Sequence, residues 1–194
     1  MNTFQLIMLL ISGFFAYKMY EHVQTIDENA EPAHEQEPTL EEKEPTVQEL
    51  VEDADKAYMD DDFEGAKKRL EDIVQKFPDF AEGMNKLAFV LSKSDDNEGA
   101  EIFYKKSLEI EPNDDVTHNA LASLYAKMGK TIQAQEHYKK AVSIDENYEL
   151  TWFNYANLMA SLGQIDEAKK MYEKAIEIDP DFTDAKEALE KLNA

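Results

Sequence analysis

The 194-residue sequence contains no cysteine at all. Disulfide frameworks, thiolate metal sites and cysteine nucleophiles are therefore excluded on chemical grounds. Positive charge is also scarce, because 20 Lys and Arg stand against 42 Asp and Glu and give a formal net charge of −22. A chain of this charge repels nucleic acid phosphates, so we expect no nucleic acid partner.

Catalytic and cofactor motifs are missing as well. The sequence has no glycine-rich phosphate loop after a strand, no Gly-x-Ser-x-Gly elbow and no His-Glu-x-x-His zinc helix. The acidic residues of 60–71 have spacings similar to a calcium loop, but the repeat described below predicts a helix over 63–76. We interpret the histidines as satisfied or exposed side chains; they are His22, His34, His118 and His137. We expect a protein that is not an enzyme and has no cofactor and no metal site.

One long apolar stretch lies at the N-terminus, over residues 4–20. A helix of this length rises about 25 Å, close to the thickness of a bilayer's hydrocarbon core. No Lys or Arg precedes the stretch, and bulky residues stand where a signal peptidase would cut. We predict an uncleaved transmembrane anchor over residues 1–20. Attachment at the membrane interface and an unusual cleaved signal are the alternatives.

Residues 21–46 contain three prolines, many glutamates and almost no large apolar side chains. Such a segment cannot bury enough surface to fold, so we predict a disordered acidic linker. Lys18 and Lys43 are the only basic residues near the downstream end of the predicted anchor. By the positive-inside rule they favour a cytoplasmic position for the rest of the chain, at a bacterial inner membrane.

From residue 47 onward, the same residue types recur every 34 residues. The recurring positions are Ala54, Ala88, Ala122 and Ala156, then Ala66, Ala100, Ala134 and Ala168, then Leu70, Tyr104, Tyr138 and Tyr172. Each row predicts two helices separated by a short break, and its small residues let the two helices approach closely. Gly129 and Gly163 are expected to end the first helix in a left-handed conformation, with aspartate at the matching positions of the first two rows. The residues expected to cap the next first helix are Asp79, Asn113, Asn147 and Asp181.

This pattern resembles the tetratricopeptide repeat (TPR), a 34-residue helical hairpin. The fourth row matches it with Trp152, Tyr155, Ala156, Ala168, Tyr172, Ala175 and Pro180. The resemblance implies an all-α fold, a right-handed α-solenoid of four hairpins with a C-terminal capping helix over 183–194. The hairpins are expected at 47–80, which is degenerate, and at 81–114, 115–148 and 149–182.

The resemblance also implies a concave groove lined by the first helices. The residues expected to face it are Asn85, Lys86, Phe89, Lys93, Asn119, Ser123, Lys127, Phe153, Asn154, Asn157 and Ser161. An asparagine amide can donate to and accept from a peptide backbone, so the four asparagines predict a peptide-binding surface. Simple solvation of these asparagines is the alternative. The few lysines argue against a clamp for a C-terminal carboxylate.

We therefore expect a membrane-tethered scaffold or adaptor that binds peptide segments of other proteins and contacts the bilayer through residues 4–20. A periplasm-facing assembly chaperone that holds unfolded clients, for example in cytochrome or secretion-complex biogenesis, is the alternative. Self-association of the stacked repeats is a third reading. The sequence does not identify the partner, the pathway or the oligomeric state.

Overall fold

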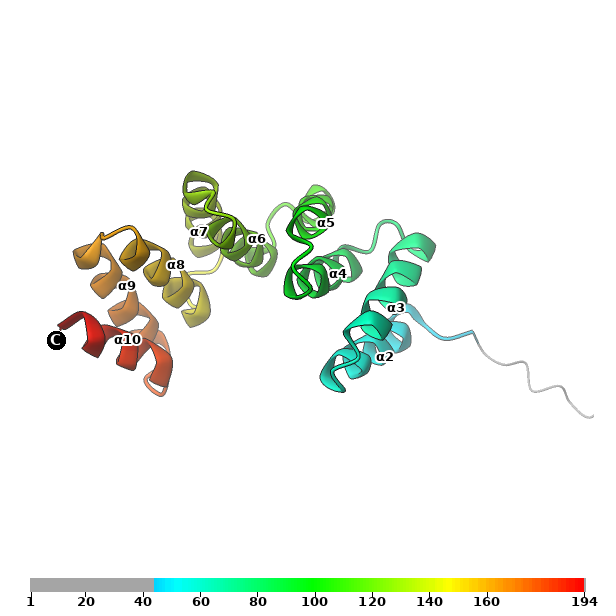
Figure 1. The fold of residues 1–194 in the computed structure, drawn as a ribbon, viewed down its shortest axis with the longest axis horizontal. Coiled ribbons are helices and arrows are strands. Elements are labelled where there is room, and N and C mark those ends of the chain that lie inside the picture. Colours follow the sequence, from blue (N-terminus) through cyan, green and yellow to red (C-terminus); the bar gives the residue numbers. More distant parts are fainter. Residues whose placement is uncertain (1–43, 194) are drawn as a thin grey trace, which may run out of the picture. The chain divides into compact units, whose positions relative to one another are not determined.

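The computed structural model describes residues 44–193, and these form nine α-helices and no strand. The helices are α2 (Val47–Met59), α3 (Phe63–Lys76), α4 (Ala81–Lys93), α5 (Asn97–Ile110), α6 (Asp115–Lys127), α7 (Thr131–Ile144), α8 (Glu149–Ser161), α9 (Ile165–Ile178) and α10 (Thr183–Asn193). The first eight form four helix pairs, numbered here 1 to 4 in chain order, and each pair packs against the next (Figure 1). Helix α10 packs against α9. The predicted all-α fold of helical hairpins is confirmed.

The predicted anchor (1–20) and nearly all of the predicted linker (21–46) lie outside the described residues. Within residues 44–193, no helix has the length and apolar character needed to cross a membrane.

Each helix pair meets at alanine. The eight alanines of the two recurring positions, Ala54, Ala88, Ala122, Ala156, Ala66, Ala100, Ala134 and Ala168, are all 0% exposed. The large residues one turn later, Leu70, Tyr104, Tyr138 and Tyr172, are 2–3% exposed. A methyl group at the helix crossing lets the two backbones approach, and the larger side chain fills the space beside it. The predicted packing of the two alanine positions is confirmed.

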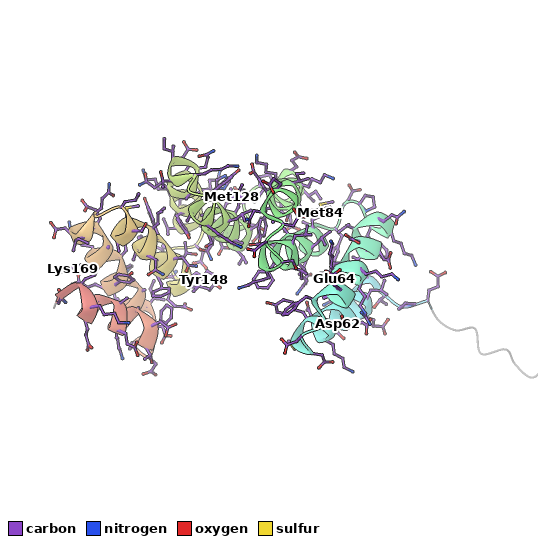
Figure 2. The ribbon with its side chains drawn as sticks, viewed as in Figure 1. Asp62, Glu64, Met84, Met128, Tyr148 and Lys169 are labelled. Atoms are coloured by element: carbon purple, nitrogen blue, oxygen red, sulfur yellow. The ribbon has the colours of Figure 1, made fainter. Side chains whose placement is uncertain are left out.

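Each first helix ends at the same position of the 34-residue row. A left-handed backbone conformation occurs there in Asp61 (φ 61°), Asp95 (φ 63°), Gly129 (φ 72°) and Gly163 (φ 74°). The second helix begins two residues later, and in the first two pairs an aspartate caps it. Asp62, labelled in Figure 2 at the start of α3, accepts a hydrogen bond from the Gly65 N–H at 2.9 Å. The prediction that these four residues end the first helices is confirmed.

The capping of the next first helices differs from expectation. The N-cap residues are Phe80, Asp114 and Tyr148, one position after the expected Asp79, Asn113 and Asn147. Of these three N-cap residues, only Asp114 caps with its side chain, which accepts from the Val116 N–H at 3.2 Å. Backbone hydrogen bonds also close the loops before α4 and α6, from Phe80 N to Phe77 O at 3.1 Å and from Asp114 N to Glu111 O at 3.3 Å. The expected capping residue lies inside this turn and so cannot reach the helix.

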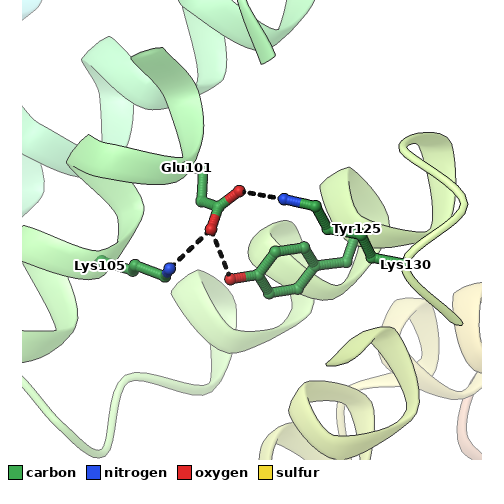
Figure 3. Close-up of polar contacts among 4 residues, drawn as sticks. All are labelled: Glu101, Lys105, Tyr125 and Lys130. Carbon is green, nitrogen blue, oxygen red and sulfur yellow. Dashed lines mark hydrogen bonds and ion pairs between the residues drawn. The ribbon is translucent and has the colours of Figure 1, made fainter. Parts of the chain in front are cut away.

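A cluster of four polar side chains joins pairs 2 and 3 (Figure 3). The Glu101 carboxylate on α5 accepts hydrogen bonds from Lys105 Nζ at 2.6 Å, from Lys130 Nζ at 2.6 Å and from the Tyr125 hydroxyl at 3.1 Å. The hydrogen bonds from Lys105 and Lys130 lower the pKa of the Glu101 carboxyl to about 2. Glu101 is therefore ionised at neutral pH, and it connects its own helix to the end of α6 and the turn that follows.

Candidate functional site

A groove of about 490 Å³ extends across the first helices of pairs 2, 3 and 4. We call it the α4–α8 groove. Its lining residues are Asn85, Phe89, Ser92, Lys93, Tyr104, Val116, Asn119, Ala120, Ser123, Leu124, Lys127, Tyr148, Leu150 and Asn154. Seven of the residues expected from the sequence line this groove: Asn85, Phe89, Lys93, Asn119, Ser123, Lys127 and Asn154.

The asparagines of the groove bond to neighbouring helices. Asn154 Nδ2 on α8 donates to Asn119 Oδ1 on α6 at 3.2 Å. Asn85 Nδ2 on α4 donates to the hydroxyl of Thr117, which in turn donates to the Asp114 carboxylate. One atom of each amide therefore fixes the spacing between successive first helices.

The remaining amide atoms have no partner among the described residues; Asn85 and Asn154 are partly exposed, and Asn119 is 6% exposed at the floor of the groove. Within residues 44–193, no hydrogen bond engages Asn119 Nδ2 or the Oδ1 atoms of Asn85 and Asn154. These atoms supply one donor site and two acceptor sites to the same groove. An extended backbone presents N–H and C=O groups in alternation, so donors and acceptors of this kind suit it.

The two edges of the groove have different chemistry. The residues from the starts of α6 and α8, which are Val116, Tyr148 and Leu150, are largely apolar; Figure 2 labels Tyr148. At the helix ends, Lys127 Nζ donates to Ser92 O at 2.9 Å and pairs with Asp95 at 2.7 Å. The bond from Lys127 lowers the pKa of the Asp95 carboxyl. The Lys127 charge is thus already balanced by the protein itself.

Four of the predicted residues lie outside the groove. Lys86 Nζ is 2.9 Å from Asp55 on α2, which joins pairs 1 and 2. The Phe153 ring packs against Tyr172 and Phe182, with centroid distances of 5.8 and 5.0 Å.

Asn157 Oδ1 accepts a hydrogen bond from the Tyr172 hydroxyl at 2.5 Å. Ser161 Oγ donates to Leu158 O at 2.7 Å within its own helix. The contacts of Lys86, Phe153 and Asn157 connect neighbouring helices or the loop after α9, whereas that of Ser161 stays within α8; none of these four side chains lines the groove.

Sequence reasoning missed the apolar edge of the groove, which consists of Val116, Leu150 and Tyr148. Val116 and Leu150 each occupy the second position of a row, which is one of the positions that face inward in TPR proteins. The pattern could therefore have found them. Tyr148 precedes its helix, and only the course of the connecting loop brings it to the groove edge.

Two histidines contact each other between α6 and α7. His118 Nδ1 is 2.9 Å from His137 Nδ1, and His118 Nε2 is 3.1 Å from Pro112 O. Burial lowers the pKa of His137 to about 4 and also lowers the pKa of His118. Residues 44–193 contain no group of three or more His, Asp or Glu side chains placed to hold a metal ion. The segment 60–71, whose acidic residues have spacings similar to a calcium loop, enters helix α3 at Phe63, so the predicted helix over 63–76 is confirmed.

Comparison with known proteins supports the repeat pattern. Three family models described as tetratricopeptide repeat match residues 81–114, 103–136 and 125–192. Together the three models span more than half of the chain. No curated protein matches the sequence.

Solved structures share the fold. A crystal structure of MamA has a TM-score of 0.65 and 20% identity, over 75% of this chain and 80% of that one. A second MamA crystal structure gives a TM-score of 0.64 and 22% identity, over 72% and 81% of the two chains. The first TPR of Spaghetti (RPAP3), bound to the HSP90 peptide SRMEEVD, has a TM-score of 0.56 and 24% identity, over 58% of this chain and 90% of that one. With its helix pairs, its 34-residue register and its family matches, the chain belongs to the tetratricopeptide repeat family.

Proposed function

We propose that the chain is a membrane-tethered scaffold whose α4–α8 groove binds extended segments of partner proteins. The observation that carries this proposal is the set of unpaired amide atoms on Asn85, Asn119 and Asn154, which lie beside apolar residues of the same groove. The amides suit a ligand's backbone, and the apolar edge suits its side chains. The Spaghetti TPR, which has the same fold, was solved with a peptide bound and supports this reading.

The groove assignment is tested by removing two amides together. Asn119 and Asn154 bond to each other, so replacing both with alanine leaves no unpaired partner behind. A library of random 12-residue peptides is panned against the full-length chain in a mild detergent, and the best binder is measured by fluorescence anisotropy. Two lost hydrogen bonds of about 1 kcal/mol each predict affinity weaker by about 10- to 30-fold.

Asn157→Ala is the matched control, because it removes an amide from α8 that does not line the groove. Unchanged affinity in the Asn119→Ala, Asn154→Ala variant contradicts the groove assignment. An equal loss in Asn157→Ala contradicts it too.

The tether rests on the apolar stretch at residues 4–20. A cytoplasmic position of the repeats is tested with a single cysteine at the exposed Ser161, since the chain has no other thiol. Membrane pellets should retain the protein after an alkaline wash, and an impermeant maleimide should label it only after lysis. Labelling in intact, outer-permeabilised cells would favour the chaperone alternative.

A further inference from the structure

Three aromatic rings of pairs 1 and 2 gather at one end of the α4–α8 groove. The Tyr58 ring on α2 lies 5.3 Å from Phe63 on α3 and 5.5 Å from Phe89 on α4, measured between centroids, at interplanar angles of 71° and 57°. Phe63 is 39% exposed and Phe89 is 40% exposed, and neighbouring Met59 is 81% exposed. We call Tyr58, Phe63 and Phe89 the aromatic cluster. Tyr58 packs against the core, whereas Phe63 and Phe89 are too open to be needed to fill it.

Carboxylates lie beside one ring of the aromatic cluster, Phe63. The turn between α2 and α3 consists of Asp60, Asp61 and Asp62, and Glu64 follows in the first turn of α3. Figure 2 labels Asp62 and Glu64 near each other on this helix. A hollow of about 380 Å³ is lined by Asp61, Asp62, Phe63, Glu64, Lys93 and Ser94.

These carboxylates are largely uncompensated. Among the described residues, Asp60, Asp61 and Glu64 form no ion pair. Asp62 caps α3, and its one ion pair is a 3.8 Å contact with Arg69. The three carboxylates that line the hollow with Phe63 repel an acidic ligand and attract a basic one.

The protein already places a cation on this surface. Lys93 Nζ lies 5.2 Å from the centroid of the Phe89 ring. Lys93 lines both the hollow and the α4–α8 groove, so the two adjoin at this residue. The face of an aromatic ring attracts a cation electrostatically, so a ligand cation that displaces Lys93 would meet the Phe89 ring. The carboxylates lie in the adjoining hollow, which Lys93 also lines.

We propose that the aromatic cluster and its carboxylates bind an arginine or lysine side chain of the partner segment. This inference rests on the proposed function, because Phe89 and Lys93 also line the α4–α8 groove. Arginine fits best, since its planar guanidinium stacks on a ring while its edge donates hydrogen bonds to carboxylates. The groove then selects partner segments that carry a basic residue where the groove meets the aromatic cluster.

The test compares the affinity of a peptide that has a basic residue with that of the same peptide carrying a neutral residue at this position. Peptides panned against the full-length chain are expected to share an arginine or lysine at one position. The best binder is then synthesised as two peptides, one with that basic residue and one with glutamine in its place. The basic peptide is expected to bind the wild-type chain at least about fivefold more tightly.

Three variants identify the surface responsible. Phe89→Leu keeps an apolar side chain but removes the ring, so the fivefold ratio should fall toward one. Lys93→Gln removes the competing cation, so the ratio should rise. Ile132→Ala, which alters another exposed apolar residue, 71% exposed at the start of α7, should leave the ratio unchanged.

Opposite results overturn the inference. An unchanged ratio in Phe89→Leu, or a lower ratio in Lys93→Gln, rules out cation binding on this ring. Selected peptides that depend on Asn119 and Asn154 but share no basic residue overturn this inference and leave the groove function standing. Failure to select any peptide overturns both.

Discussion

At the scale of single residues, the contact between His118 and His137 makes stability depend on pH. Burial lowers the pKa of both rings, to about 4 for His137, and the Lys105 and Lys140 charges near His137 act in the same direction. Asp114 and Asp115 near His118 oppose the shift without cancelling it. Both rings are therefore neutral in the folded state at neutral pH.

The free energy of unfolding should fall as pH drops from about 6.5 to about 4. In this window the unfolded chain binds protons on histidine that the folded chain does not, and protonation therefore favours unfolding. The slope from His137 alone is at most about 1.4 kcal/mol per pH unit. Urea denaturation of the full-length chain at pH 7.5, 6.5, 5.5 and 4.8 measures it.

His137→Gln should make the stability of the chain less dependent on pH over this range. Measurements stay above pH 4.5 because the low folded-state pKa of Glu101, about 2, adds a growing loss of stability as the unfolded chain protonates this carboxyl at lower pH. A stability that is constant from pH 7.5 to 4.8 in the unmodified chain would show that the two rings are accessible to protons in the folded state.

Sequence periodicity predicted seven residues that line the groove and four that do not, and it did not give their bonding partners. A 34-residue repeat tells which side of a helix a residue occupies, and it placed Asn119 and Asn154 on the first helices that line the groove. Whether an amide is open to a ligand depends on the atoms of the neighbouring helix. Lys86, for example, pairs with Asp55, 31 positions earlier, and no repeated column of the sequence shows that pairing.

At the scale of elements, the turns inside the helix pairs were predictable because backbone conformation restricts residue type. Glycine adopts a left-handed conformation at no steric cost, and aspartate tolerates it next best. The loops between pairs were less predictable. They close through backbone hydrogen bonds that any residue can make, so the capping residue could not be assigned from side-chain type.

Asp61→Gly should stabilise the protein by about 0.5–1 kcal/mol. The substitution removes the cost of a left-handed aspartate, which is about 1–2 kcal/mol, and the greater freedom of glycine in the unfolded chain returns part of that gain. Asp95→Gly should gain less, because it also removes the pairing with Lys127 at 2.7 Å. Gly129→Ala, at φ 72°, should destabilise instead.

Urea midpoints of the three variants and the unmodified chain test this order. A loss of stability in Asp61→Gly would mean that its carboxylate makes a favourable contribution that outweighs the backbone cost.

At the scale of the whole described part, helix pairs contact mainly their sequence neighbours. Stability in such a stack is approximately the sum of the stabilities of the pairs and of the interfaces between them. The interface between pairs 2 and 3 includes the Glu101 cluster (Figure 3). Two of its hydrogen bonds cross from α5, one to Tyr125 on α6 and one to Lys130 in the following turn, and the third joins Glu101 to Lys105 within α5. Weakening this interface should therefore reduce the cooperativity of unfolding more than changes elsewhere on α5.

Glu101→Gln should cost about 1–2 kcal/mol, because two lysines lose their charged partner while an amide of the same size remains. Hydrogen exchange along a urea series should then separate two groups of amides, with α2–α5 and α6–α9 opening at different denaturant concentrations. Glu109→Gln makes the same charge change on the same helix at a residue that forms no ion pair within residues 44–193, so it should leave the two groups together. If Glu101→Gln instead shifts all the amides equally, packing of the alanine and tyrosine positions alone couples the helix pairs, and the ion cluster is dispensable for their cooperation.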